Sequence, residues 1–393
     1  MASRADLAKS LGMSQPTAGK IVDELIAIAV IEETSLPHAE AGAVATIQLG
    51  RPGRQLRLNQ SHAKFLAIQL GINTTTLAGL TLAFANEDRW PVSFDMAEVS
   101  AKALHPERVW EKKLRQAAKL LGNGKYLGVL LSVPGVVDEA ANRILFSPNI
   151  HWTEKSDLAR MVQRVWDAPV LLIQEERALA LGHNMADPEC EDFLLVDFGE
   201  GVGGAVIVDG RPLSNPLPIS GEIGHTPVPG NTRACGCGAV GCMETLISLR
   251  GLLESHAAAA PGADHSWTGL NRYIAETGIK PWLAQALDAA AAAIAGALNV
   301  VGLRRVVITG LVTDLPPAVM EYFSRAIQGG AMWARFGEVE CIAAPRRRTA
   351  GLVAFGIDRV IVPDLNEKNL VPKARASAKV SRPAGPGKKF ATK

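Results

Sequence analysis

The sequence has few cysteines, no long apolar run and no signal peptide. Five cysteines in 393 residues are too few for a disulfide framework, which favours a reducing compartment. The longest nearly unbroken apolar stretch, Ala289 to Leu298, is far shorter than the ~20 residues of a membrane span. The first ten residues carry Arg4, Asp6 and Lys9 where a signal peptide has an apolar core. We therefore expect a cytoplasmic protein of two or three domains.

Basic residues outnumber acidic ones only at the C-terminal end, and the rest of the chain has an acidic excess of six. From Lys368 onward there are eight Lys or Arg and no Asp or Glu, so 33 of the 41 basic residues precede it, together with all 39 acidic ones. This tail has almost no large apolar side chains and cannot bury enough surface to fold, so we expect residues 367–393 to be disordered. Two interpretations remain open: a solvated extension, or an arm that contacts nucleic acid phosphates without sequence preference.

The N-terminal residues have the pattern of two short helices around a turn. Ser3 can cap a helix that ends near Ser10, and Gly12 suits the turn because it tolerates positive φ. Ser14 can cap a second helix with Pro in its first turn. Its apolar residues recur at helical spacing: Ile21, Val22, Leu25, Ile26 and Ala29. This pattern is typical of a helix-turn-helix, and residues 30–33 and 44–49 look like the two strands of a wing.

The rest of the chain alternates between apolar strand-like runs and amphipathic stretches. Helices are predicted over His105–Leu121 and Pro281–Val301. Strands are predicted over Phe65–Leu70, Thr74–Leu82, Tyr126–Val133, Val170–Ile173, Phe193–Val196, Ala205–Val208 and Arg305–Ile308. This order indicates an α/β architecture with a largely parallel sheet.

Three cysteines and one histidine fall within eighteen residues that are rich in glycine. The predicted ligands are His225, Cys235, Cys237 and Cys242, a Cys₃His set that suits tetrahedral Zn²⁺ and closes the site to catalytic water. The alternative is three buried thiols and an unrelated histidine. Cys190 and Cys341, by contrast, stand alone among apolar neighbours. We expect a structural zinc ion that holds a loop in place.

The segment that contains these ligands, Gly221 to Glu244, resembles the signature of the ROK family (repressors, open reading frames and kinases). The likeness extends over residues 3–361 and includes four further segments: Val133–Asp138, Phe146–Asn149, Pro169–Gly182 and Asp197–Asp209. The first sixty residues resemble the winged helix-turn-helix of its repressor branch, including 14–17 and 50–52. The resemblance implies an actin-like, sugar-kinase-type (ribonuclease H-like) α/β body of two lobes at 61–366, with a sugar between the lobes, after a DNA-binding domain at 1–60.

Three positions at the nucleotide end depart from the pattern of the family's kinases. Their Asp-x-Gly-Gly-Thr loop is matched here by Gln69 to Asn73, with Ile72 where backbone approaches phosphate. Their Gly-Thr-Gly loop is matched here by a Gly-Glu-Gly sequence, in which the carboxylate of Glu200 would repel a polyphosphate. Their catalytic base, an Asp after an Asn, is matched by Glu175 after Gln174, and a shift of ~1 Å can lower a rate ~100-fold. We expect no catalytic residue and no kinase activity; the alternative is a sugar kinase with a vestigial DNA-binding head.

The sugar end of the resemblance is better preserved. Asn149, Glu222, His225 and Glu244 match positions where the family contacts sugar hydroxyls, with Glu175 as a fifth ligand-binding residue. One ring nitrogen of His225 would bind zinc while the other donates to the ligand. Alternatively, Glu222 and Glu244 are partners of the metal site or helix caps.

DNA contacts are expected at the start of the second helix. Ser14, Gln15, Thr17, Ala18 and Lys20 are early positions that could enter a major groove. Arg51 and Arg54 could reach a minor groove, or could belong to a charged linker. Residues 1–59 hold six basic and six acidic side chains, so they give no basic footprint. The family has a further helix before the one at Ser3, so either the true start lies upstream or the head is incomplete.

The sequence thus predicts a cytoplasmic transcriptional regulator, a repressor whose body binds a sugar or sugar phosphate and whose head binds an operator in double-stranded DNA. A homodimer or dimer of dimers is expected, because two-fold symmetric half-sites in DNA are usually met by two-fold protein symmetry. A third possibility is an orphan regulator or assembly protein whose cleft binds no sugar.

Overall fold

The computed structural model describes residues 2–34, 54–60, 64–82, 90–99, 103–122, 124–213 and 220–363. These form two compact units, one of residues 2–57 with 361–363 and the other of Leu58–Val360. We call them the head and the body, and each is described by itself. The predicted wing strand at 44–49 and the tail at 367–393 lie outside the described residues.

The head contains the predicted pair of helices, α1 (Arg4–Ser10) and α2 (Gln15–Ala27). Ser3 caps α1 in a capping box with Asp6, and the hydroxyl of Ser14 accepts the amide hydrogen of Thr17. Gly12, between the helices, has φ +63° as the turn requires. A three-stranded sheet has the order β1-β3-β2, with β1 at Ala2–Ser3, β2 at Ile31–Thr34 and β3 at Gln55–Leu58. Strand β3 was not predicted.

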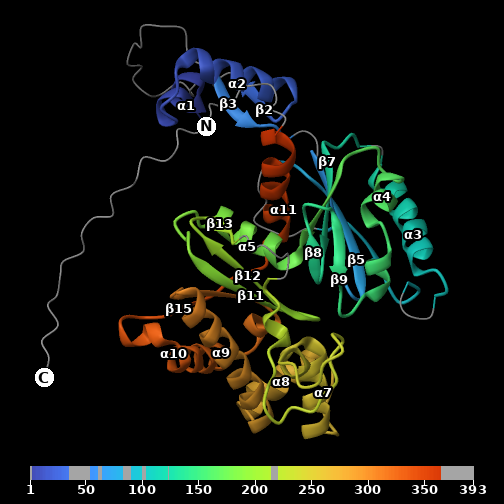
Figure 1. Ribbon diagram of the computed structural model, residues 1–393, viewed down its shortest axis with the longest axis vertical. Coiled ribbons are helices and arrows are strands. Elements are labelled where there is room, and N and C mark those ends of the chain that lie inside the picture. The colour runs from blue at the N-terminus through green and yellow to red at the C-terminus, as the bar shows by residue number, and fades with distance from the viewer. Residues whose placement is uncertain are drawn as a thin grey trace, which may run out of the picture. The chain divides into compact units, whose positions relative to one another are not determined.

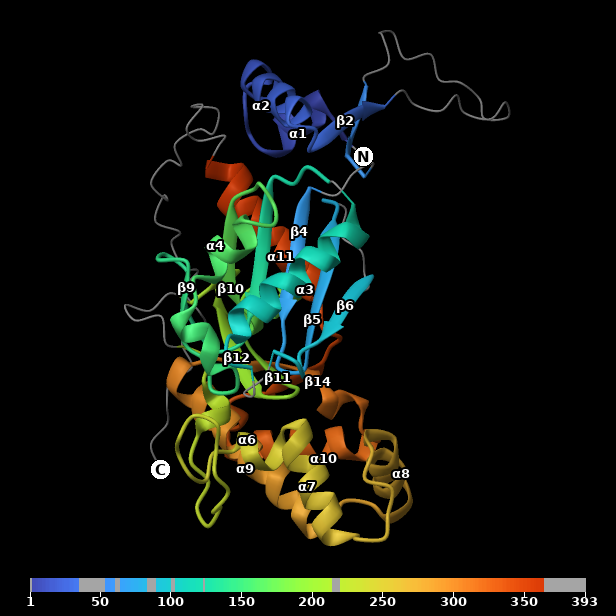
Figure 2. The same cartoon turned by 90° about the vertical axis from the view of Figure 1, so that its right-hand side faces the viewer.

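The first lobe of the body is built on a five-stranded sheet in the order β10-β7-β4-β5-β6. Helices α3 (Pro106–Leu121) and α4 (Leu158–Gln163) cover one face of it, where Trp110 and Leu114 are fully buried (Figure 2). A small hairpin, β8 (Val136–Asp138) and β9 (Arg143–Phe146), follows β7. The sheet strands are β4 (Phe65–Leu70), β5 (Thr74–Leu80), β6 (Val92–Asp95), β7 (Gly128–Val133) and β10 (Val170–Gln174).

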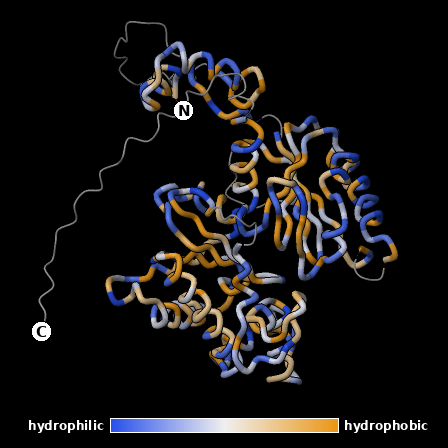
Figure 3. The backbone as a smooth tube through the Cα atoms, viewed as in Figure 1, coloured by the Kyte–Doolittle hydropathy of each residue, from blue (hydrophilic) through white to orange (hydrophobic). Residues whose placement is uncertain are grey.

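The second lobe has a sheet in the order β13-β12-β11-β14-β15. Its strands are β11 (Phe193–Phe198), β12 (Val202–Val208), β13 (Arg211–Pro212), β14 (Arg305–Gly310) and β15 (Glu340–Ala343). Its helices are α6 (Glu244–Ile247), α7 (Leu249–Ala259), α8 (Trp267–Thr277), α9 (Pro281–Val301) and α10 (Pro317–Gly330). Alternate residues of β11 pack into different cores, Val196 with α9 and α10 and Leu195 on the opposite face, so the strand is apolar except for Asp197 (Figure 3).

The prediction of a largely parallel sheet is wrong, because both sheets are mixed. Strands β4, β7 and β10 are parallel, as are β11, β14 and β15. Strands β5, β6, β12 and β13 instead pair antiparallel with their neighbours. The turn between β4 and β5 spans only residues 71–73, and so short a connection can join only antiparallel strands.

Two helices, α5 (Glu175–Ala186) and α11 (Arg348–Gly356), link the lobes (Figure 1). Helix α5 packs against β7 and β10 of the first sheet and against β11 and β12 of the second. The two helices cross so closely that a Cβ at Gly351 would lie 1.7 Å from the carbonyl oxygen of Ala178. Both helices begin at the same end of the body, and this brings their first residues into one cleft.

Helix α9, with 21 residues, has the length and apolar composition of a membrane span. Leu287, Ile294 and other residues of one face are buried against the second sheet and α10. A core helix passes the same test of length and composition, so α9 is weak evidence for a membrane.

Candidate ligand-binding cleft and metal centre

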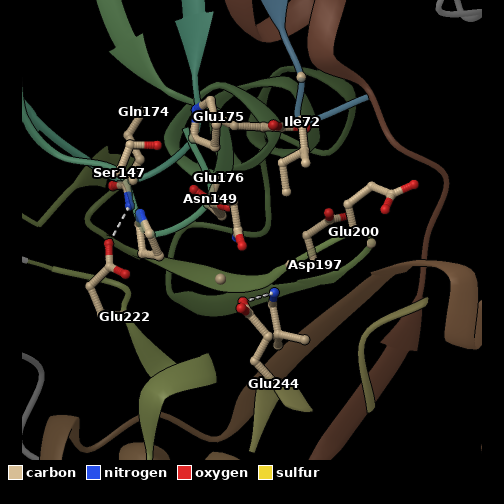
Figure 4. A pocket seen from close by; sticks show the side chains of 18 of the residues that line it. Ile72, Ser147, Asn149, Gln174, Glu175, Glu176, Asp197, Glu200, Glu222 and Glu244 are labelled. Atoms are coloured by element: carbon tan, nitrogen blue, oxygen red, sulfur yellow. Dashed lines mark hydrogen bonds between the residues drawn. The ribbon is translucent and has the colours of Figure 1, made fainter. Parts of the chain in front are cut away.

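A cavity of ≈ 260 Å³ lies where the carboxyl ends of β4, β10 and β11 meet (Figure 4). This is the edge at which α/β sheets usually bind ligands. The five side chains predicted to bind ligand all line it, from four different segments: Asn149, Glu175, Glu222, His225 and Glu244. The residues that resemble the degenerate kinase loops line the same cavity: Gln69, Gly71, Ile72, Gln174, Gly199, Glu200 and Gly201.

Glu222 and His225 face each other at one side of the cavity. The Nε2 of His225 is 3.6 Å from Oε2 of Glu222, and Gln174 donates a hydrogen bond of 3.4 Å to the other carboxylate oxygen (Figure 4). Burial and the nearby Glu244 carboxylate both raise the pKa of Glu222. The geometry leaves Nε2 of His225 on the ligand side, as expected for a histidine that serves both a metal and a ligand.

Glu244 has a structural contact as well as a place in the cavity wall. It is the first residue of α6, and its Oε2 accepts the backbone amide hydrogen of Val202 at 2.9 Å (Figure 4). A Cβ at Gly201 would lie 2.9 Å from the same oxygen and 4.0 Å from Nδ2 of Asn149. One carboxylate oxygen of Glu244 therefore holds the start of β12, a structural contact that is neither a helix cap nor a bond to a metal ligand.

Glu175, at the position of the kinase base, is paired within the protein. Its Oε1 accepts a hydrogen bond of 3.1 Å from Gln69 and forms an ion pair with Arg348, whose side chain is only 7% exposed. Gln69 is itself held by the hydroxyl of Thr76. Oε1 of Glu175 is therefore already occupied by partners within the protein, and is not free to accept a proton from a sugar hydroxyl.

A second arginine, Arg346, binds Asp197 at the same end of the cavity. Its Nε and Nη2 make hydrogen bonds of 2.7 and 2.8 Å to the two carboxylate oxygens, and Thr309 donates a further one. Burial alone would lower the pKa of Arg346, but the Asp197 carboxylate outweighs it and raises that pKa. The Nη2 atom lies 2.6 Å from where a Cβ of Gly199 would be, so the guanidinium packs against the loop that resembles a phosphate-binding turn.

Sequence reasoning missed several lining residues: Ser147, Glu176, Asp197, Arg346 and Arg348. The last two belong to a run of three arginines at the start of an apolar helix, where positive charge is unfavourable for the helix dipole. That conflict was a usable signal of a buried ionic role. Asp197 is one acidic residue within strand β11, and Glu176 follows Glu175 in the first turn of α5, where acidic residues are common, so neither gave a comparable signal.

The four predicted metal ligands come together. One atom from each of His225, Cys235, Cys237 and Cys242 lies within 4.8 Å of the other three. Nδ1 of His225 is 3.5 Å from Sγ of Cys235, and the sulfurs of Cys237 and Cys242 are 3.6 Å apart. Tetrahedral zinc with bonds of about 2.3 Å to sulfur and 2.0 Å to nitrogen sets such separations at roughly 3.5–3.8 Å. The donor set and its spacing therefore fit a zinc ion.

The cysteine loop is anchored to the second lobe by two polar side chains. Arg233 donates hydrogen bonds to the carbonyl oxygens of Thr245 and Gly251, at 2.6 and 3.1 Å. Asn231 donates one to the carbonyl oxygen of Cys242. These contacts connect the metal ligands to the start of α6, where Glu244 faces the cavity.

Cys190 does not stand alone, contrary to the sequence-based expectation. It forms a second close group with His183 and Asp187. Arg305 lies against the Cys190 thiol. Burial lowers the pKa of His183; the Asp187 carboxylate opposes this, and the charges of Arg347 and Arg305 add to the lowering. Two neighbouring guanidinium groups disfavour a cation, so we do not assign a metal to this group.

In the head, the predicted DNA-contacting residues differ in exposure. Gln15 and Lys20 are exposed, whereas Thr17 is half-buried with its hydroxyl 2.7 Å from that of Ser14. Ala18 is only 3% exposed, so its prediction as an exposed position is wrong. It falls on the inner face of α2 with Val22, four residues later.

The two arginines near the predicted wing have separate outcomes. Arg54 makes an ion pair of 3.0 Å with Glu33, which Arg4 also binds. The side chain of Arg54 is 68% exposed, and such exposed pairs contribute little to stability, so its contact with DNA stays a prediction. Arg51 lies outside the described residues.

Comparison with known proteins places the chain among ROK proteins. The model of the ROK family matches residues 105–353. The chain is 24% identical over 268 residues to a xylose repressor from Caldicellulosiruptor bescii, an alignment that covers 64% of this chain and 61% of that protein. It is 27% identical over 192 residues to a glucokinase from Halalkalibacterium halodurans, covering 48% of this chain and 57% of the relative. The chain thus spans about three fifths of the curated relatives' length.

A solved structure shares the fold over nearly the whole chain. It is a ROK family transcriptional regulator, a homologue of the E. coli MLC protein, with a TM-score of 0.70 and 21% identity. The match covers 93% of this chain and 95% of that one. This confirms the two-lobed sugar-kinase-type fold with a helix-turn-helix region before it.

Proposed function

The chain belongs to the ROK family, and we propose that it is a sugar-responsive, DNA-binding transcriptional repressor that does not phosphorylate its sugar. In this proposal residues 1–60 bind DNA, 61–366 bind the effector and 367–393 form a basic tail. The observation that carries it is the pairing of Arg346 with Asp197 and of Arg348 with Glu175. These pairs occupy the end of the cavity where a kinase would hold phosphate and a free base.

The two ion pairs argue against phosphoryl transfer on electrostatic grounds. A kinase stabilises charge on the transferred phosphoryl group with Mg²⁺, backbone amides and basic groups that are free to bind it. Here both arginines that line the cavity are already neutralised by carboxylates, and Glu200 adds a further negative charge. The relatives include both a repressor and a glucokinase, so they do not distinguish the two functions. The two ion pairs within this chain support the repressor.

The opposite side of the cavity supports sugar binding. Asn149, Glu222, His225 and Glu244 line it, and carboxylates and amides are suited to paired hydrogen bonds with hydroxyl groups. A repressor that responds to a sugar must bind it with different affinities in its two DNA-binding states. Because half-sites in DNA usually match two-fold symmetry, we propose a cytoplasmic homodimer or dimer of dimers.

The metal centre lies beside the residues that we propose bind the sugar, and His225 belongs to both sites. We propose that His225, Cys235, Cys237 and Cys242 hold one structural Zn²⁺. Four protein ligands leave no position for catalytic water, so the ion would fix the loop and not activate a reaction. The imidazole of His225 would then be fixed by its Nδ1 and present Nε2 toward Glu222.

DNA selection tests the proposal directly. The full chain, a chain without residues 368–393 and Gln15→Ala are each used to select from random double-stranded DNA. We expect one motif with the full chain. The tail deletion should weaken all binding alike and flatten its salt dependence, because phosphate contacts carry no sequence information. Gln15→Ala should relax one base pair in each half-site, at ~1–3 kcal/mol.

Two outcomes would contradict this proposal. Failure of the full chain to select any motif, with or without sugar, would favour the alternative of an assembly protein. ADP release from ATP and Mg²⁺ in the presence of D-xylose, D-glucose or D-mannose would favour the alternative of a sugar kinase with a vestigial head.

A further inference from the structure

Two side chains in the cavity wall have buried polar atoms that lack partners. Oγ of Ser147 and Oε2 of Glu176 make no hydrogen bond within the described part of the chain, although both residues line the cavity. Unpaired buried polar atoms are rare in proteins because each loses its hydration without compensation. When such atoms lie in the wall of a cavity, a bound molecule can supply the missing partner.

The local structure makes room for the Glu176 carboxyl group. Glu176 is the second residue of α5, and a Cβ at Gly203 of β12 would lie only 2.4 Å from its Oε1. A side chain at position 203 would displace the carboxyl group. Ser147 is fixed as well, since its backbone amide donates to Glu154 at 3.1 Å and its residue is 1% exposed. Figure 4 shows both residues on the wall of the same cavity.

The surroundings of Glu176 favour the neutral acid. Burial raises its pKa well above the usual value, and the carboxylates of Glu175, Glu222 and Asp197 raise it further. A protonated carboxyl group has an O–H that can donate, and it keeps the ability to accept. The serine hydroxyl has the same dual capacity. Sugar hydroxyls are matched to such groups because they also donate and accept.

The charges that remain in the cavity disfavour a phosphorylated ligand. Arg346 forms an ion pair with Asp197, and Arg348 forms one with Glu175. The other ionisable groups among the described lining residues are four glutamates and one histidine: Glu176, Glu200, Glu222, Glu244 and His225. A phosphate group would find carboxylates without a free guanidinium, and like charges at short range repel strongly in a low-dielectric cleft.

We propose that Ser147 and Glu176 hydrogen-bond the hydroxyl groups of an uncharged sugar, and that this cavity discriminates against sugar phosphates. The proposal rests on the proposed function, in that it names the effector class and two further residues that bind it. It narrows the choice between a sugar and a sugar phosphate that the sequence left open.

Calorimetric titration of the full-length, metal-loaded chain tests this proposal. The probes are D-xylose, D-glucose, D-mannose and N-acetyl-D-glucosamine, together with the 6-phosphates of the last three. For a neutral sugar that binds the wild type, we expect Glu176→Ala and Ser147→Ala each to weaken binding about tenfold, the loss of roughly one hydrogen bond. Glu176→Gln keeps a donor and an acceptor, so it should bind within about threefold of the wild type. Each phosphate should bind at least about tenfold more weakly than its parent sugar.

The control and the opposing outcomes separate this inference from the proposed function. Glu189→Gln, an exposed position outside the cavity lining, should bind like the wild type. Circular dichroism without sugar checks that each variant is folded, and the other alanine variant carries the test if one of the two is not. Unchanged affinity in Glu176→Ala and Ser147→Ala would mean that water alone satisfies these atoms and would overturn the contacts. Equal or tighter binding of a phosphate would overturn the ligand class. No heat with any probe would overturn this proposal, and the DNA selection would then decide the proposed function separately.

Discussion

The two ends of the cleft differ in how completely their polar groups are paired within the chain. At one end, Asp197 and Glu175 are bound by Arg346 and Arg348. Next to it, Ser147 and Glu176, which directly follows Glu175 in α5, keep buried polar atoms without partners in the described structure, and we call this part of the cleft the unpaired end. Since buried polar groups are nearly always satisfied, the first end is complete without a ligand and the second is not. Residues that line a cleft therefore differ in whether they still have a hydrogen bond to offer a ligand.

The largest expected effect concerns the loop that supports the unpaired end. Cys237→Ser removes one of four proposed metal ligands, and we expect metal affinity to fall by more than about 100-fold, the upper value for loss of a residue that only supports a ligand. Stability and sugar binding should fall together, because His225 belongs to both sites. Elemental analysis and thermal unfolding measure this, with Cys341→Ser as a matched control away from the cluster. A wild-type chain that is metal-free yet fully folded would contradict the prediction.

The paired end can be broken by removing one of its arginines. Arg346→Met should lower the free energy of unfolding by about 3 kcal/mol, because it leaves the Asp197 carboxylate buried without its main partner. Adding Asp197→Asn to that variant should restore much of the loss. Urea denaturation measures both effects. The control is Arg250→Met, whose exposed pair with Glu254 should contribute less than about 1 kcal/mol. If Arg346→Met lowers the free energy of unfolding no more than Arg250→Met does, the Arg346–Asp197 pair does not stabilise this end of the cleft.

The unpaired end can be examined through pH. An unfolded glutamate loses its proton above about pH 4.3, whereas folded Glu176 keeps its proton to higher pH because burial raises its pKa. The folded state then binds more protons, so this group lowers the free energy of unfolding as pH rises through that window. Glu176→Gln does not titrate. Its stability relative to the wild type should therefore increase from about pH 5 to pH 8, measured by urea denaturation. A difference that is constant with pH would contradict a raised pKa.

The smallest expected effect is that of Glu175→Asp, which should gain no kinase activity. Glu175→Asp restores the residue type of a kinase base, but Arg348, Asp197 and Arg346 still occupy the phosphate end. We expect no ATP-dependent phosphorylation of D-glucose or D-xylose above the wild-type background, in a coupled assay for ADP. Phosphorylation by this single variant would show that the ion pairs do not prevent phosphoryl transfer.

The sequence predicted the helices, the strands and the residues that line each site better than it predicted which side chains contact one another. Helix caps at Ser3 and Ser14 are local interactions, so their positions follow from a few neighbouring residues. The metal ligands are also close in sequence. The Arg346–Asp197 pair joins residues 149 positions apart, and no local pattern predicts such a contact.

Two predictions failed for reasons that periodicity does not resolve. Ala18 is small and sits between Thr17 and Gly19, so its burial depends on how α2 packs within the head. The direction of a strand depends on the length of the connection before it, and the apolar pattern of β5 carries no information on direction.

The close approach of Gly203 to Glu176 has a consequence for sequence evolution. The carboxyl group occupies the space that any side chain at position 203 would need, with 2.4 Å between Oε1 and a Cβ there. Substitutions at the two positions are therefore not independent. In descendants that retain Glu176, position 203 should remain glycine, whereas those with a small residue at 176 can accept alanine or serine at 203. If the effector changed through a substitution at position 176, position 203 would then accept other residues. Correlated substitutions at the two positions would therefore mark such a change of effector.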